Sequence, residues 1–190
     1  MPDAPAFVNK LIFATAERSS MSYGADYLTE FDRVIRCHLL PREKNVLEWG
    51  VGHTTLFLVE NHATYDLGSL VSIDHDCDYL KSVVAQLPAW PGFEPFCCDL
   101  MGPKLSDRDP EPNYATFPLS LQRRFDLIYI DGRRRLECAL AATQVCAPDG
   151  IVVLHDYRRR RYDMVRVLFD IVEDGSQFRV MRPKPLRSVG

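Results

Sequence analysis

The sequence lacks any long apolar stretch: none of its segments approaches the roughly 18 consecutive apolar residues that a membrane helix requires. It also lacks a charge excess, because 23 Lys and Arg residues face 26 Asp and Glu residues, which leaves a formal net charge of −3. The opening segment, MPDAPAFVNKLIFATAERSS, has neither the basic start nor the apolar core of a secretory signal. We therefore expect a cytoplasmic protein with no membrane partner and no overall attraction to nucleic acid.

Cysteine pairs of the CxxC type are absent as well. The six cysteines lie mostly within apolar or helical patterns, where a free thiol behaves as a small hydrophobe. They are Cys37, Cys77, Cys97, Cys98, Cys138 and Cys146. We expect them to pack in a reducing compartment, the adjacent Cys97 and Cys98 included.

What the 190 residues do contain is an alternation of short β-rich runs with helical patterns. This alternation predicts one α/β domain over residues 1–190, with a mainly parallel sheet and helices on both faces. The expected strands are 45–49, 70–73, 93–97, 125–130 and 151–154. The expected helices between and after them are 54–61, 77–87, 134–146 and 162–173.

Three segments lie outside this alternation. We expect residues 1–41 to form an N-terminal helical segment, in which Ser22 is the N-cap. Residues 101–124 contain four prolines and predict a long ordered loop, of the kind that often covers a site. Gln177 to Met181 can form one last strand, so we expect a shortened C-terminal edge that a second copy of the chain could complete.

A glycine-containing turn follows the first expected strand. Gly50 and Gly52 would allow a tight turn and a close approach of backbone to a ligand, and a helix that opens at Thr54 offers free N–H groups. About 26 residues after Glu48, the second strand ends in Asp74, where nucleotide-binding α/β domains place an acid against ribose hydroxyls. Together these features predict a nucleotide-like ligand.

Each later strand also delivers a carboxylate at its C-terminal end: Asp99, Asp131, and Asp156 preceded by His155. Strand ends are polar by default, so one or two acids there would mean little. Four in register point to the edge at which open α/β sheets bind ligands.

Three stretches, NVLEWGVGHTTLFL, VSIDHD and FDLIYIDGRRRLECALAATQVCAPDGIVVLHDY, resemble successive motifs of class I S-adenosylmethionine-dependent methyltransferases. The likeness is to the small bacterial branch whose fourth strand ends in IDG and whose fifth ends in HD, and it covers about residues 28–169. It implies a Rossmann-like, doubly wound fold with strand order 3-2-1-4-5 that binds S-adenosylmethionine.

The resemblance also implies roles for individual residues. The turn at Glu48, Gly50 and Gly52 would carry the methionine and ribose parts of the cofactor, with Thr54 and His75 beside it. Asp74 would hold the ribose hydroxyls, Asp99 would lie near the adenine, and Asp131 would face the reactive methyl group. Two features depart from the pattern: His53 and Thr54 replace the third glycine, and Arg133 to Arg135 follow IDG where many relatives have an acid and a histidine.

Methyl transfer needs an aligned acceptor and, for a hydroxyl or ammonium nucleophile, a base. The candidates are Asp131, His155 and Asp156, although a histidine at a strand end can also simply bond to backbone. Asp131 and Asp156 could bind Mg²⁺ through their oxygens, but no third ligand is identifiable, and the predicted site contains no metal.

Two arginine runs, 133–135 and 158–161, follow the fourth and fifth strands and would flank the same pocket. They would attract an acidic small molecule, or they are solvated helix starts. Nucleic acid fits less well, because the basic residues are few and lack interleaved aromatics.

The sequence thus predicts a methyltransferase that acts on a small acceptor, with an anionic one as an open alternative. Two other hypotheses are a non-catalytic protein that binds S-adenosylmethionine and a nicotinamide-dependent oxidoreductase. The incomplete glycine fingerprint argues against the oxidoreductase.

Overall fold

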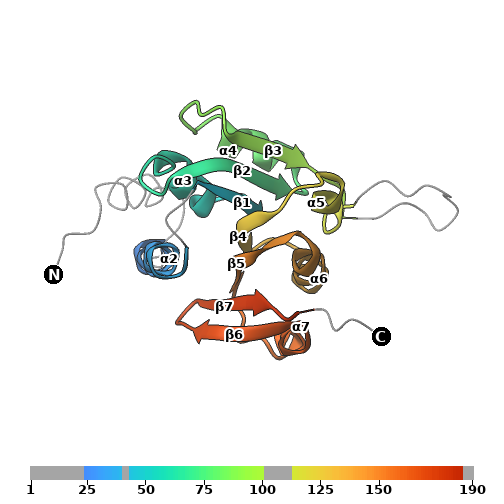
Figure 1. Ribbon diagram of the computed structural model, residues 1–190. Coiled ribbons are helices and arrows are strands. Elements are labelled where there is room, and N and C mark those ends of the chain that lie inside the picture. Colours follow the sequence, from blue (N-terminus) through green and yellow to red (C-terminus); the bar gives the residue numbers. More distant parts are fainter. Residues whose placement is uncertain (1–23, 40–42, 101–112, 186–190) are drawn as a thin grey trace, which may run out of the picture.

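The computed structural model describes residues 24–39, 43–100 and 113–185. Its centre is a seven-stranded sheet with the order β3-β2-β1-β4-β5-β7-β6, and Figure 1 shows helices packed on both sides of it. The strands are β1 Lys44–Trp49, β2 Leu67–Asp74, β3 Phe93–Cys97, β4 Phe125–Ile130, β5 Cys146–His155, β6 Phe169–Asp174 and β7 Phe178–Pro183. The pairings from β3 through β5 are parallel. The predicted α/β class and the order 3-2-1-4-5 are confirmed.

Up to β5, the helices predicted between the strands are present. The helices are α2 Gly24–His38, α3 His53–Glu60, α4 Cys77–Val84, α5 Phe117–Ser120, α6 Arg135–Val145, the 3-10 helix η1 Arg160–Tyr162, and α7 Val165–Leu168. Of these, α5 is an additional short helix within the predicted loop. Apolar side chains of α2 and α3 pack on one face of the sheet. Those of α6 and α7 pack on the other.

The central strands are apolar on both faces because both faces are covered. Every residue of β4 is buried. In β1, Val46 points toward the α2 and α3 layer, whereas Leu47 and Trp49 point toward the α6 layer. Since side chains alternate along a strand, this rigid frame sets which residues emerge where each strand ends.

Beyond β5 two predictions are wrong. The expected helix over 162–173 is replaced by η1, the four-residue α7 and the strand β6, in which Phe169 is buried and its neighbours alternate in exposure. The C-terminal edge is not shortened either, because β6 and β7 form a complete antiparallel hairpin. β7 pairs with β5, so the hairpin extends the sheet without help from a second chain.

Parts of the two remaining predicted segments can be compared. The helix after Ser22 is present as α2, while Ser22 itself lies outside the described residues. Of the loop predicted over 101–124, residues 101–112 lie outside the described residues, and the rest contains α5. The proposed lid therefore stays a prediction.

Candidate active site

The turn after β1 depends on a glycine at position 50. Gly50 has φ +94°, a conformation that side chains rarely adopt, and an added Cβ would lie 2.6 Å from the backbone nitrogen of Gly132. At Gly52, by contrast, a Cβ would meet, among the described residues, only the hydroxyl of Tyr79, at 3.7 Å. Gly50 therefore lets the β1 and β4 ends touch, and the described residues around Gly52 leave room for a ligand to approach the backbone.

Glu48 is fully buried beneath this turn. Its carboxylate accepts hydrogen bonds from the hydroxyls of Thr54 and Thr55, both at 2.6 Å, and of Ser72 at 2.7 Å. Burial raises the pKa of Glu48 to about 7, although the three hydroxyl donors act in the opposite direction. Glu48 thus joins β1, β2 and the start of α3, and Thr54 donates its hydroxyl to that junction.

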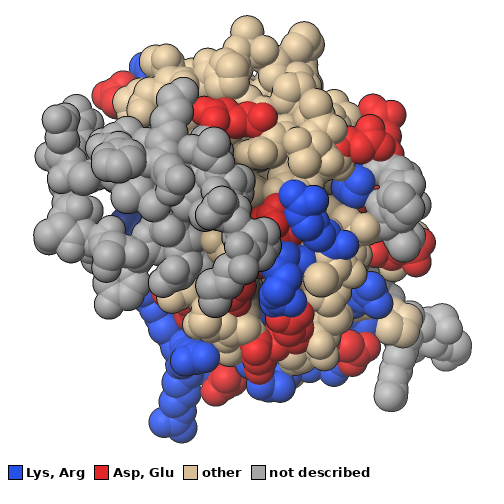
Figure 2. All heavy atoms as spheres, turned by 90° about the vertical axis from the view of Figure 1, so that its left-hand side faces the viewer, with Lys and Arg blue, Asp and Glu red and all other residues tan. Residues whose placement is uncertain are grey.

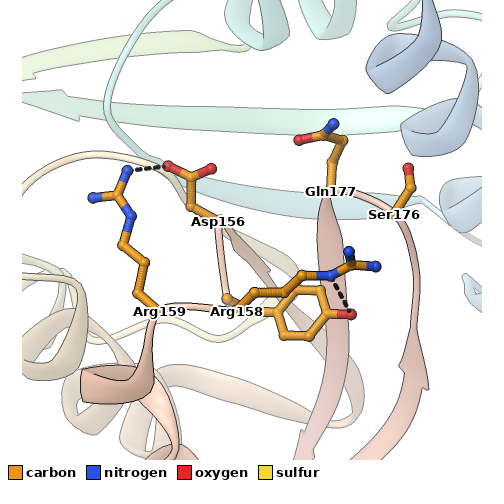
Figure 3. A pocket seen from close by; sticks show the side chains of 6 residues that line it. Asp156, Arg158, Arg159, Ser176 and Gln177 are labelled. Atoms are coloured by element: carbon orange, nitrogen blue, oxygen red, sulfur yellow. Dashed lines mark hydrogen bonds and ion pairs between the residues drawn. The ribbon is translucent and has the colours of Figure 1, made fainter.

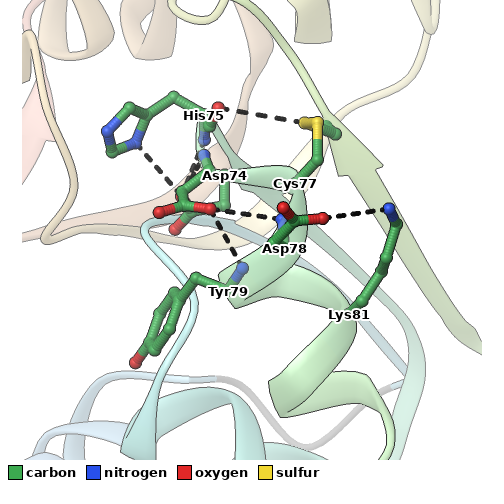
Figure 4. Close-up of a disulfide and its surroundings, with 8 residues drawn as sticks. Asp74, His75, Cys77, Asp78, Tyr79 and Lys81 are labelled. Atoms are coloured by element: carbon green, nitrogen blue, oxygen red, sulfur yellow. Dashed lines mark hydrogen bonds and ion pairs between the residues drawn. A yellow bond between two sulfur atoms is a disulfide. The ribbon is translucent and has the colours of Figure 1, made fainter.

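Asp74, at the end of β2, is held by backbone. Val51 N–H donates to Oδ2 at 3.0 Å, and the N–H groups of His75 and Asp76 donate to Oδ1 at 2.7 and 2.9 Å. Figure 4 shows the His75 ring turned toward the same carboxylate, with Nδ1 3.1 Å from Oδ1. Of these contacts only the one from Val51 reaches Oδ2, so that oxygen keeps one acceptor position for a further donor.

Beside Asp74 the structure corrects a prediction. Cys77, the first residue of α4, and Cys97, the last residue of β3, form a disulfide (Figure 4). The two cysteines meet because Asp74 pairs with Cys97 in the parallel β2–β3 register and α4 begins three residues later. The other four are free, and Cys98, Cys138 and Cys146 are buried as predicted.

Asp99 follows β3 and is exposed. Its carbonyl accepts the N–H of Tyr114, and Tyr114 is completely buried with its ring 6.1 Å from that of His75. The burial of Tyr114, and the bond from Trp49 Nε1 to its carbonyl, fit an anchor of its loop.

The structure brings the other three predicted site residues together at the ends of β4 and β5. His155 Nδ1 lies 3.0 Å from Oδ1 of Asp131 and 3.7 Å from Oδ1 of Asp156. Asp131 and Asp156 each expose about a third of their side chains, at 34% and 35%. A buried imidazole nitrogen thus sits between two partly accessible carboxylates.

Arg135 organises this group and was missed as a site residue. Its guanidinium lies 2.9 Å from Oδ1 of Asp131 and 3.6 Å from Oδ2 of Asp156, and it donates to the carbonyl of His155 at 2.7 Å. It also holds the turn after β4 through the carbonyls of Asp131 and Gly132. The sequence placed it in the run 133–135 that flanks the pocket, and its spacing of four residues from Asp131 was the further signal.

Asp156 itself has an unusual backbone, with φ +56°. Such strain in a residue other than glycine is often found at functional sites. Asp156 lines a cavity of about 280 Å³. Figure 3 shows Arg159 turned toward the Asp156 carboxylate, and Arg158 Nε donates to the hydroxyl of Tyr157 at 3.4 Å. Arg159 donates to Asp156 Oδ2 at 2.7 Å.

Two tyrosines complete the site and were not singled out from the sequence. Tyr27 of α2 places its ring 5.8 Å from that of His155, and burial together with Asp131 and Glu48 raises its pKa. Tyr79 of α4 lies over Gly52, and burial, Asp74, Glu48 and Asp131 raise the pKa of its phenol. Both phenols therefore lie close enough to the carboxylates of the strand ends for that negative charge to raise their pKa.

Among the described residues, no group of three or more carboxylate, histidine or cysteine side chains has an arrangement that could hold a metal ion, the cluster of His155, Asp131 and Asp156 included. Asp131 and Asp156 are bridged by Arg135, whose positive charge occupies the place that Mg²⁺ would need. We therefore derive no step through a metal.

On the face shown in Figure 2, acidic and basic side chains of the described residues lie next to one another among the other residues, drawn in tan. Among the described residues, no helix has the length and apolar character needed to cross a membrane.

Comparison with known proteins agrees with this architecture. The model of a methyltransferase domain family matches residues 47–157. No curated protein matches the sequence.

Solved structures with the same fold include several methyltransferases. A methyltransferase-like protein from Silicibacter pomeroyi is 19% identical with a TM-score of 0.57, over 88% of this chain and 91% of the other. A TDP-rhamnose 3'-O-methyltransferase of calicheamicin biosynthesis is 13% identical with a TM-score of 0.62, over 96% of both chains. The N-methyltransferase NodS from Bradyrhizobium japonicum is 16% identical with a TM-score of 0.54, over 84% and 96%.

These likenesses show the fold, and the family model covers more than half of the sequence, from β1 to just beyond β5. The chain belongs to the methyltransferase domain family and is an enzyme of the methyltransferase type.

Proposed function

We propose that this chain binds S-adenosylmethionine at the carboxyl ends of β1 and β2 and transfers its methyl group to a small acceptor, which can be anionic, at the ends of β4 and β5. The observation that carries the proposal is the position of His155, whose Nδ1 lies 3.0 Å from Asp131 and 3.7 Å from Asp156, beside the Gly50 to Gly52 turn.

On the cofactor side, the residues fit the group. Asp74 keeps one acceptor position that a ribose hydroxyl can use, and His75 lies beside it. The room that the described residues leave at Gly52 admits the chain of the methionine part, and Asp99 is exposed where an adenine would lie. The carboxylates around this space favour a cationic sulfonium.

Glu48 and Thr54 serve this cofactor indirectly in our proposal. The Thr54 hydroxyl donates to the Glu48 carboxylate, and neither group is directed to the ligand, so both hold the turn in the shape that ligand binding needs. Gly50 does the same by allowing contact with Gly132.

On the acceptor side, S-adenosylmethionine supplies a methyl carbon that is electrophilic because it is bonded to a sulfonium. An acceptor oxygen or nitrogen would take the methyl group with loss of S-adenosylhomocysteine, and His155 would receive the proton that the acceptor gives up. Asp131 faces buried Nδ1 and stabilises the protonated ring, which leaves Nε2 to receive the proton. Arg135 fixes both carboxylates.

We also propose a cytoplasmic location, which the four free cysteines support. In that compartment the Cys77–Cys97 pair would be reduced for much of the time, because disulfides are rare there. A homo-oligomer remains a proposal; Met164 and Val167 near the β6 edge expose 68% and 74% of their surface and could contribute to one.

Calorimetric titration with S-adenosylmethionine, S-adenosylhomocysteine and NADH tests the function. We expect saturable binding of the first two and none of NADH; binding of NADH alone would support the oxidoreductase alternative. Incubation with mixtures of candidate acceptors should then release S-adenosylhomocysteine. Binding without any release would favour the non-catalytic alternative.

A further inference from the structure

A cavity of about 290 Å³ lies where the turn after β4 and the start of α6 face η1. Five arginines and one acid contribute to its lining. They are Arg133, Arg134, Arg135, Arg159, Arg161 and Glu137. So many like charges around one small cavity call for a partner of the opposite sign.

The ion pairs in the structure neutralise only part of this charge. Arg135 and Arg159 are paired with the carboxylates of the proposed catalytic group. Within the described residues Arg133 and Arg134 form no ion pair, and Arg161 donates only to the neutral hydroxyl of Tyr162. Three guanidinium groups are therefore available to an anion.

The local backbone adds to the case. Arg134 is the N-cap of α6 and has φ 46°, a left-handed conformation that is strained for arginine. The positive end of the helix dipole lies at the same place, so adjacent arginines oppose helix stability. Free N–H groups at a helix start and guanidinium forks are, however, the two devices that bind phosphate.

The arginine cavity adjoins the proposed catalytic group. Arg135 lines it and contacts Asp131, and Arg159 lines both this cavity and the one beside Asp156 (Figure 3). An anion held by Arg133 and Arg134 would thus belong to a molecule whose remainder reaches the acceptor side.

We propose that the arginine cavity binds a phosphate monoester group and that the methyl acceptor is a small phosphorylated molecule. A phosphate carries nearly two negative charges and three acceptor oxygens, which match three unpaired guanidinium groups better than one carboxylate does. This inference rests on the proposed function, since it names the substrate class for the same site.

The experiment measures binding of inorganic phosphate and of acetate by calorimetry, in wild type and three variants. Arg133→Gln with Arg134→Gln removes two charges. Arg134→Gly removes one and accepts the left-handed backbone, so the turn should still form. Arg160→Gln is the matched control, because Arg160 belongs to the same run but does not line the cavity.

We expect phosphate to bind wild type at least tenfold more tightly than acetate. The double variant should lose at least tenfold and Arg134→Gly at least threefold in phosphate affinity, while Arg160→Gln stays within twofold of wild type. Absence of saturable phosphate binding, equal binding of acetate, or an equal loss in Arg160→Gln would overturn the proposal. Tighter binding of a single-stranded RNA oligomer through the same arginines would also overturn it, in favour of nucleic acid.

S-adenosylmethionine is titrated into every variant. Its affinity should not change in the double variant, since these arginines lie outside the cofactor side. A wild type that binds S-adenosylmethionine but not phosphate contradicts this inference alone. A wild type that binds phosphate but no S-adenosylmethionine contradicts the proposed function.

Discussion

The two halves of the candidate site hold their carboxylates in different ways. At the ends of β1 and β2, Glu48 and Asp74 are buried and bound by hydroxyls and backbone N–H groups. At the ends of β4 and β5, Asp131 and Asp156 are partly exposed and bound by arginine side chains.

The difference matches what each half is proposed to do. Donors fixed by the fold keep a carboxylate in one position, as binding of an invariant cofactor requires. Arginine side chains can turn toward a new anion, so the second half can rearrange when an acceptor enters. We expect substitutions in the first half to affect cofactor affinity or stability, and those in the second to affect turnover.

Asp131→Asn should have the largest effect. The variant keeps the shape of the side chain but loses the charge that stabilises a protonated His155, and turnover should fall roughly 10²- to 10⁴-fold. Affinity for S-adenosylmethionine should stay within threefold, because Asp74 and the glycine turn are unchanged. Release of S-adenosylhomocysteine and calorimetry measure the two quantities, with the exposed Asp163→Asn as control. Equal losses in both would mean that Asp131 is structural.

The disulfide gives the cofactor half a covalent constraint that the other half lacks. Cys77→Ser should lower the free energy of unfolding by about 3 kcal/mol, since the bond closes a loop with a sequence separation of 20 residues. Urea denaturation with and without a reductant measures this loss, and Cys37→Ser, which removes a free exposed thiol, is the control. Wild-type protein that is equally stable in both conditions would contradict the prediction.

Asp74→Asn should weaken S-adenosylmethionine binding by about 1 to 3 kcal/mol, the range for hydrogen bonds to a charged group. Calorimetry measures the affinity. The control is Asp76→Ala, which removes the N-cap of α4, where Asp76 accepts the N–H groups of Asp78 and Tyr79, and should cost stability without changing affinity. An unchanged affinity in Asp74→Asn would remove Asp74 from the cofactor site.

Much of the fold and of the candidate site could be predicted from the sequence. Continuous apolar runs identified the buried parallel strands, and because parallel strands end at one edge, the residues that follow them had to meet. Asp131, His155 and Asp156 do meet, as do Asp74 and the turn at Gly50.

The errors have physical causes. Apolar residues at 165, 168, 169 and 172 fit a helical spacing, but Phe169 and Ile171 also alternate as in a strand, and pairing with β7 decides for the strand. The disulfide depends on the register of β2 with β3, which no local pattern reveals. Arg135 and Tyr27 reach the site through tertiary packing between layers.

Titration of Glu48 should make the stability of the cofactor half depend on pH. Its pKa in the folded chain is about 7 against an ordinary value of 4.5, so between these values the folded state binds more protons than the unfolded one. Stability should therefore fall as pH rises from 4.5 to 7, with Glu48 contributing up to about 1.4 kcal/mol per pH unit.

Glu48→Gln should remove that contribution, and urea denaturation at pH 5, 6, 7 and 8 measures it. Glu94→Gln is the matched control, because Glu94 lies on β3, is partly exposed and is paired with Arg123. An unaltered slope in Glu48→Gln would mean that the three hydroxyl donors keep Glu48 ionised throughout. The turn would then be held by a charge, as in the half at Asp131, and the contrast between the two halves would weaken.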